Sequence, residues 1–139
     1  KRHRIQDALE AVKEAQLEGV LPGGGTFLVQ KSKHLYSKTK SGADNEWEEL
    51  GIKIVEKAIQ EPLRQMAKNA DQSADLILSK LLHRKNGEGY DFKNSKMTNM
   101  VEAGIIDPAR VTRCALQNAV SVASTLITSN YAIVESHTT

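Results

Sequence analysis

The sequence predicts an all-α, multihelical fold with a small β-hairpin and a C-terminal strand. Several segments place apolar residues at i, i+3 and i+4, the spacing that gives a helix one apolar face. Proline, glycine and small polar residues separate these segments. A single Asn-Gly pair, Asn86-Gly87, gives a hairpin signal. The chain has 139 residues, which is the size of one domain that can bury its own core. Its formal charge is +2.

The first predicted helix runs from about Arg2 to Glu18, because apolar residues recur along one face: Ile5, Ala8, Leu9, Val12 and Ala15. Three glycines, Gly23 to Gly25, follow it. Glycine tolerates positive φ and lets a ligand approach the backbone, so the turn suits phosphate or ribose. The same glycines could serve only to turn the corner between two helices, and the sequence leaves both interpretations open. A second helix is predicted from about Thr26 to Tyr36, followed by a loop at 37–43.

Asp44 can cap a third helix, which the glutamates of its first turn would favour. Its predicted buried stripe consists of Trp47, Leu50, Ile54, Val55, Ala58 and Ile59. Trp47 and Tyr36 are interpreted as packing residues of the core or a corner. Glu61-Pro62 breaks this helix and begins a fourth, because proline disfavours helix in the residue before it and is welcome in a first turn. The fourth helix extends to about Ala70 and is expected to bury Leu63, Met66 and Ala67.

Asp71 or Ser73 can cap a fifth helix with apolar residues Ile77, Leu78, Leu81 and Leu82. The Asn-Gly pair before Tyr90 predicts a short β-hairpin around residues 85–90. A short helix is then expected to carry Met97, Met100 and Val101 and to end at Gly104.

Asp107-Pro108 combines an N-cap residue with a proline at the first helical position, and therefore predicts the start of the longest helix. The expected buried face of that helix is Val111, Ala115, Ala119, Val122, Ala123 and Leu126. The stretch from Tyr131 to Glu135 is predicted to be a strand, which requires a pairing partner.

Composition excludes several classes of protein. The only cysteine, Cys114, cannot form an intramolecular disulfide, and its neighbours indicate a small buried apolar residue. The basic clusters at 31–34 and 83–85 are too short to bind nucleic acid, and no apolar run is long enough to span a membrane. The four histidines show no metal-ligand spacing, so no metal site is expected in these residues.

Five motifs follow one another in an order and spacing that resemble the C-terminal part of a group I chaperonin, the GroEL type also found in mitochondria and plastids. They are Asp7-Ala8-Leu9, Gly23-Gly24-Gly25, Glu61-Pro62-Leu63-Arg64-Gln65, Gly104-Ile105-Ile106-Asp107-Pro108 and Val111-Thr112-Arg113. The likeness covers roughly residues 4–135. It implies a piece of a longer subunit, with residues 1–18 a helix from the intermediate domain and residues 19–139 the C-terminal half of the equatorial ATPase domain.

This resemblance implies a segment of an ATP-dependent folding chaperone in the cytoplasm or in an organelle matrix. It also implies sister subunits in a ring, a co-chaperonin, and unfolded clients held by an apical domain outside these residues. Asp7 matches the catalytic carboxylate that positions the water attacking the γ-phosphate of ATP. Gly24 matches the glycine whose backbone lies against the nucleotide, and Asp107 matches the carboxylate that accepts hydrogen bonds from ribose hydroxyls. The ATP and Mg²⁺ would be held mainly by residues outside the segment.

The sequence departs from the family after Gly89-Tyr90, where Asp91-Phe92-Lys93 replaces the small Asn-Ala-Ala that lines the base pocket. Phe92 and Lys93 must either point outward or crowd the adenine, so Asp91 is a doubtful nucleotide contact and altered ATP affinity is expected. An alternative is a helical interaction module that has lost turnover. The Gly-Asp-Gly-Thr-Thr phosphate cradle is also missing here, so the isolated segment is expected neither to bind ATP well nor to hydrolyse it.

Overall fold

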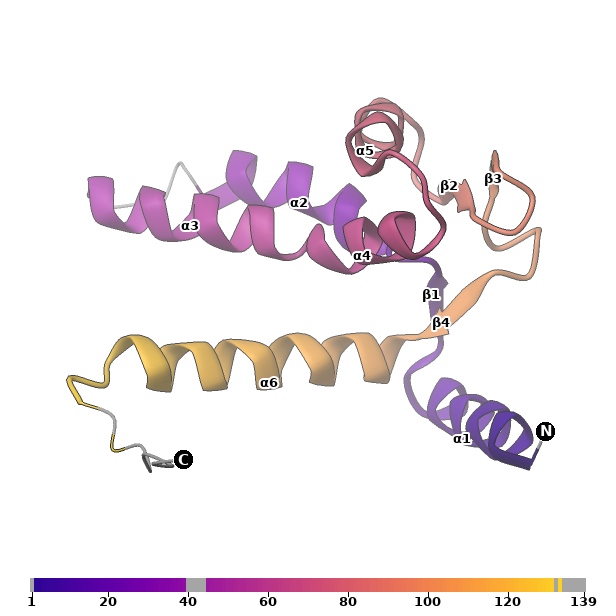
Figure 1. Cartoon of the computed structure of the whole chain (residues 1–139), viewed down its shortest axis with the longest axis horizontal. Helices are drawn as coiled ribbons and strands as arrows, with labels where there is room; N and C mark the ends of the chain where they lie inside the picture. Colours follow the sequence, from indigo (N-terminus) through magenta and orange to yellow (C-terminus); the bar gives the residue numbers. More distant parts are fainter. Residues whose placement is uncertain (1, 40–44, 132, 134–139) are drawn as a thin grey trace, which may run out of the picture. The chain divides into compact units, whose positions relative to one another are not determined.

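A computed structural model describes residues 2–39, 45–131 and 133 of the chain, without the side chains of residues 2 and 36–39. The chain divides into two compact units (Figure 1). One, the α1–α6 unit, comprises Lys1–Gly19 and Pro108–Thr139, and the other, the central unit, comprises Val20–Asp107. The elements are α1 (Arg2–Glu18), β1 (Val20–Pro22), α2 (Thr26–Thr39), α3 (Glu46–Ala58), α4 (Glu61–Asn69), α5 (Ala74–Leu82), β2 (Glu88–Asp91), β3 (Lys96–Asn99), β4 (Ile106–Pro108) and α6 (Ala109–Ile127).

The helices agree closely with the sequence prediction, apart from the end of α2. Helix α2 continues to Thr39, so the first three residues of the predicted loop at 37–43 are helical. The rest of that loop and the predicted cap Asp44 lie outside the described residues. Asn45 caps α3 instead, since its side-chain oxygen accepts the N–H of Glu48 at 3.0 Å. Of the two candidate caps of α5, Ser73 is the one used.

The predicted hairpin is present, but its turn lies later in the chain. Strands β2 and β3 are antiparallel, with Glu88 opposite Asn99 and Asp91 opposite Lys96, so the loop of the hairpin is 92–95. The Asn86-Gly87 turn precedes β2 and does not join the two strands. The short helix predicted around Met97 and Met100 was wrong, because Lys96–Asn99 pairs with β2 and the fully buried Met100 follows the strand directly. Strands β1 and β4 form a second, unpredicted two-stranded sheet.

The core of the central unit lies where α2, α4 and α5 meet. Its buried residues are Val29, Leu63, Ala67, Ile77, Leu78 and Leu81. The predicted burial of Leu63 and Ala67 is confirmed, while Met66 is only partly buried. Ile77, Leu78 and Leu81 belong to the apolar set predicted for α5. The predicted buried stripe of α3 was wrong except for Ile59. Trp47 is 79% exposed, because nothing in the described part of the chain covers this face of α3; the side chain of Tyr36 is outside the described residues.

The α1–α6 unit has no comparable core. No described residue of α1 is buried, and α6 has no buried residue, so the predicted buried face of α6 was wrong for this chain. Tyr131 and Ile133 belong to no strand, while the other residues of the predicted terminal strand, Ala132, Val134 and Glu135, lie outside the described residues. Among the described helices none is long and apolar enough to cross a bilayer.

Candidate functional site

The glycine turn, Gly23 to Gly25, joins β1 to α2 and packs against residues of α4. Gly24 and Gly25 have φ of +62° and +70°, a region that side-chain-bearing residues rarely adopt. A Cβ on Gly25 would lie 3.1 Å from the Cβ of Leu63 and equally close to the Cε of Met66. Packing and backbone conformation therefore both require glycine at this position, so Gly25 has a sufficient structural explanation without a ligand.

Gly24 and Asp107, two of the residues singled out in the sequence, lie together in the central unit. The backbone N–H of Gly24 donates a hydrogen bond to the Asp107 carboxyl group. Burial raises the pKa of Asp107, and the Gly24 hydrogen bond opposes that rise. A carboxylate has about four acceptor positions, so one bond from Gly24 leaves Asp107 able to accept hydrogen bonds from a hydroxyl-bearing ligand.

Asp107 does not cap the last helix, contrary to the prediction. The N-cap of α6 is Pro108, which forms no side-chain cap, and the helix begins at Ala109. Asp107 belongs to β4, which pairs with β1, and its carboxyl group accepts the Gly24 N–H. The strand pairing, which local sequence did not indicate, moves the start of the helix along the chain to Ala109.

The backbone amides around the turn are largely used inside the chain. Gly23 N–H donates to the Ile105 carbonyl at 2.9 Å, and Thr26 N–H donates to the Gly23 carbonyl at 3.1 Å. With Gly24 bound to Asp107, three amides of the turn already have protein acceptors. This turn therefore fits a ligand that donates hydrogen bonds, such as a ribose, better than it fits a phosphate.

Sequence analysis did not single out the hydroxyl of Thr26. Thr26 is fully buried, and its Oγ1 has no hydrogen-bond partner among the described residues. A Cβ on Gly89 would lie only 2.2 Å from this oxygen, so Gly89 is the residue that makes room for Thr26. The available sequence signal was a threonine directly after the glycines, which looked like an ordinary first residue of a helix.

Asp91 is engaged by its own hairpin. It is 6% exposed, and its Oδ1 accepts the N–H groups of Lys93 at 2.9 Å and Asn94 at 3.2 Å. Its Oδ2 accepts the side-chain amide of Asn94 at 2.6 Å. The Asn94 side chain is the main cause of the lowered pKa of Asp91. These bonds account for Asp91 as the residue that orders loop 92–95.

Phe92 packs against protein. Its ring lies edge-on to Tyr90, with 5.0 Å between the ring centroids and 75° between the ring planes, and both rings pack against the core cluster. Lys93 is exposed. Of the two orientations considered for the bulky residues, Lys93 therefore takes the outward one, while Phe92 turns onto Tyr90.

Asp7 lies on α1, in the α1–α6 unit, and is exposed. In that unit two ion pairs join the end of α1 to the start of α6. Glu14 pairs with Arg110 at 3.3 Å, and Glu18 receives two hydrogen bonds from Arg113, one of them 2.9 Å from Nε. The Arg113 hydrogen bond lowers the pKa of Glu18.

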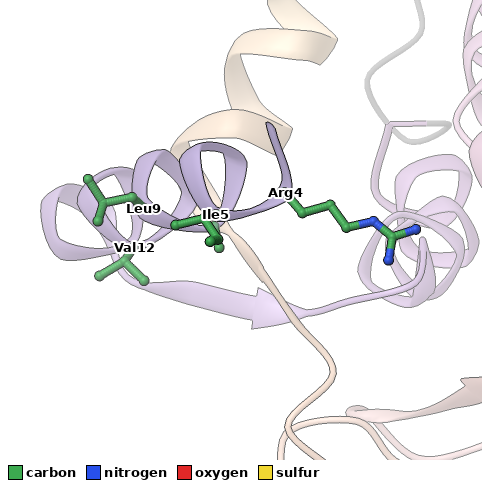
Figure 2. Close-up of a pocket in the computed structure, with 5 residues that line it drawn as sticks. Arg4, Ile5, Leu9 and Val12 are labelled. Carbon is green, nitrogen blue, oxygen red and sulfur yellow. The ribbon is translucent and has the colours of Figure 1, made fainter. Parts of the chain in front are cut away.

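A shallow hollow of about 420 Å³ runs along the apolar face of α1 (Figure 2). Its lining is Arg4, Ile5, Ala8, Leu9 and Val12, all from the one helix. Figure 2 shows Ile5, Leu9 and Val12 projecting from α1 without a polar group among them. Asp7 is not part of this lining, so the hollow offers a contact surface and no catalytic group.

The described residues contain no group of three or more side chains that could hold a metal ion. Cys114 is half-buried and forms no disulfide. The residues that have the chemistry to hold a ribose are Gly24 and Asp107.

Comparisons with known proteins point to the same family as the sequence motifs. The model of the TCP-1/cpn60 chaperonin family matches residues 1–137. A crystal structure of a group III chaperonin in the open state superposes with a TM-score of 0.78 at 32% sequence identity. The match covers 86% of this chain and 25% of that chain, so this chain spans about a quarter of that relative. These matches leave the group I assignment a prediction, but the fold, the motifs and the family match together show that the chain belongs to the TCP-1/cpn60 chaperonin family.

Proposed function

We propose that this chain supplies one side of the ATP site of a chaperonin subunit that assists protein folding within a ring of sister subunits. The observation that carries the proposal is the hydrogen bond from Gly24 to Asp107. It joins two residues that are far apart in sequence and that were both matched to nucleotide contacts. One bond from Gly24 leaves the half-buried Asp107 carboxylate with acceptor positions for ribose hydroxyls.

The proposed roles follow from the chemistry of each group. Gly24 presents a backbone without a side chain, and Asp107 accepts hydrogen bonds from the ribose hydroxyls. Asp7 orients the water that attacks the γ-phosphate and is carried to it by movement of α1. ATP with Mg²⁺ supplies the transferable phosphoryl group, and residues outside this segment hold most of it.

Two substitutions in the intact subunit test these roles. Asp107→Ala removes the acceptor, and losing hydrogen bonds to a charged group predicts ATP affinity weaker by about tenfold or more. Asp7→Ala should leave ATP binding nearly unchanged and lower turnover about 100-fold or more. Asp71→Asn, an exposed carboxylate in a turn, is the matched control and should change neither. Unchanged affinity in Asp107→Ala would remove the proposed ribose contact.

The segment alone is proposed to be inactive, since the phosphate cradle and the magnesium ligands are not among its residues. Titration calorimetry of the 139-residue chain with ATP should therefore give no heat of micromolar binding. Such binding, if it were measured, would contradict this part of the proposal.

The remaining assignments extend the same proposal. We place the protein in group I, in the cytoplasm or an organelle matrix, with residues 1–18 in the intermediate domain and 19–139 in the equatorial domain. Its partners are sister subunits, a co-chaperonin, and unfolded clients bound by an apical domain.

One observation favours a second candidate, an interaction module without turnover. Both carboxylate oxygens of Asp91 accept hydrogen bonds from its own loop, and Phe92 occupies a position where the family has a small residue. An intact protein with no ATPase activity and no nucleotide affinity would support this candidate. Activity that depends on Asp7 would exclude it.

A further inference from the structure

Two basic clusters that are short and separate in the sequence lie side by side in the central unit. Lys33 of α2 donates from its Nζ to the carbonyl of Leu82, the last residue of α5, at 3.2 Å. The residues that follow α5 are His83, Arg84 and Lys85. We define the basic patch as Lys33, His34, His83, Arg84 and Lys85, all of which are exposed. In the sequence each cluster is too short to form a binding surface by itself, and the fold brings the two clusters together.

Gln30 fixes the two halves of the patch against each other. It lies on the same face of α2 as Lys33 and His34, because residues at i, i+3 and i+4 share a face. Gln30 is 8% exposed, and its Nε2 donates to the carbonyls of Lys85 and Glu88, both at 2.9 Å. Its Oε1 accepts the N–H of Gly87 at 3.0 Å. The turn that carries Lys85 is therefore held in place before any partner arrives, which lowers the entropy cost of binding.

The charge of the patch is only partly neutralised. Glu88 pairs with Arg84 at 3.4 Å, with the Arg84 side chain about half exposed and the Glu88 side chain about a third exposed. In the part of the chain that the structure describes, no carboxylate forms an ion pair with Lys33 or Lys85. Lys33 also satisfies a carbonyl at the end of α5, and Arg84 and Lys85 follow directly after that end, where positive charge is favourable, yet both remain exposed.

We propose that the basic patch is a docking site for a short acidic segment of a partner protein. Three cations on a preformed surface match a few carboxylates, and arginine can bind a carboxylate with two parallel hydrogen bonds. Anionic membranes are usually bound by four to eight cations with apolar anchors, and single-stranded nucleic acid by longer basic grooves with aromatic stacking platforms. The basic patch is too short for either kind of partner, and its five residues include no Phe, Tyr or Trp. This proposal goes beyond the ATP site and uses none of its residues.

The test measures fluorescence anisotropy of a labelled peptide of about eight Asp and Glu residues, with an Asn and Gln peptide of equal length for comparison. The triple variant Lys33→Gln, Arg84→Gln, Lys85→Gln should bind the acidic peptide about tenfold more weakly than the wild type. The control Lys57→Gln, Lys68→Gln, Lys93→Gln changes the net charge equally at exposed positions elsewhere. It should change affinity less than about twofold.

A third variant, Gln30→Leu, keeps every charge and removes the three hydrogen bonds that hold the turn. It should also weaken acidic-peptide binding, and circular dichroism will show that each variant is folded. Equal weakening in both triple variants would mean that only net charge matters, and no binding of the acidic peptide by the wild type would mean that the patch is inert. Tighter binding of single-stranded DNA or of phosphatidylserine vesicles through the same three cations would assign the patch to another class of partner. Each of these three results overturns the proposal.

Discussion

The central unit and the α1–α6 unit are built from similar amphipathic helices, yet among the described residues only the first has a buried core. Six residues of α2, α4 and α5 form its buried cluster. In the other unit, apolar residues repeat just as regularly but remain exposed: Ile5, Leu9, Val12, Val111, Val122 and Leu126. Apolar periodicity therefore indicates which face of a helix is suited to burial, but it does not indicate whether other residues of this chain bury that face.

The contacts within each unit differ in kind as well. The central unit is held by apolar packing and by partly buried polar contacts such as the bond from Gln60 Nε2 to Ser32 Oγ at 3.0 Å. The described contacts between α1 and α6 include two exposed ion pairs, Glu14 with Arg110 and Glu18 with Arg113. Exposed ion pairs contribute little to stability, whereas large exposed apolar faces usually mark interaction surfaces. The exposed apolar faces of α1 and α6 are therefore of the kind that marks an interaction surface.

One leucine truncation in each unit tests this difference most directly. Leu63→Ala removes a fully buried side chain, so the free energy of unfolding should fall by about 2–5 kcal/mol. Leu126→Ala makes the same chemical change where the side chain is 68% exposed, and it should alter stability by less than about 0.5 kcal/mol. Urea denaturation measures both, and equal losses would contradict the contrast between the units.

A pair of glycine substitutions separates the packed turn from an open helix. Gly25→Ala must place a Cβ at φ of +70° beside Leu63 and Met66, so it should destabilise the protein by about 1–3 kcal/mol. Gly51 lies inside α3, and a Cβ added there would meet no heavy atom within 4 Å. Gly51→Ala should therefore stabilise the protein by about 0.5–1 kcal/mol. Thermal unfolding followed by circular dichroism gives both signs, and a stabilising Gly25→Ala would show that the turn is not constrained.

Asp107 gives the central unit a pH dependence with a definite sign. Its pKa is raised in the folded protein, so the folded state holds the proton more tightly than the unfolded state does. The free energy of unfolding contributed by this carboxyl group should then fall as the pH rises from its unfolded pKa, about 3.9, through the higher folded value. Asp107→Asn cannot ionise and should lose this trend.

Urea denaturation of wild type and Asp107→Asn between about pH 3 and pH 7 measures that difference. Asp71→Asn, at an exposed position, serves as the control. A wild-type stability that rises relative to Asp107→Asn over the same interval would show that the Gly24 hydrogen bond outweighs burial.

The smallest effect is expected from the ion pair that joins α1 to α6. Arg113 lowers the pKa of Glu18, so its contribution is present above the unfolded pKa of Glu18, about 4.3, and is lost as the pH falls through the lower folded value. Arg113→Gln should therefore cause a small loss of stability at neutral pH that salt at about 1 M largely removes. Lys13→Gln, on the same helix as Glu18, controls for the change in net charge. A large loss that persists in high salt would show that packing and not charge joins these helices.

Local sequence determined the helices, most of their ends and the family. Ser73 as a cap, Pro62 in a first turn and the glycines before Thr26 act through neighbouring backbone groups, so their effects can be predicted from the chain alone. The motifs around Asp7, Gly24 and Asp107 indicated the family, because their order along the chain can be recognised without knowing their positions in space. The sequence alone also singled out Gly24 and Asp107 before any contact between them was known.

Only the tertiary structure decided which apolar faces are covered, where the hairpin turns and what Asp107 does. Strand pairing placed Asp107 against Gly24 instead of at the start of α6. The same is true of the contact between Lys33 and Leu82 and of the three bonds of Gln30. These features depend on groups that are distant along the chain, and local propensity carries no information about contacts of that kind.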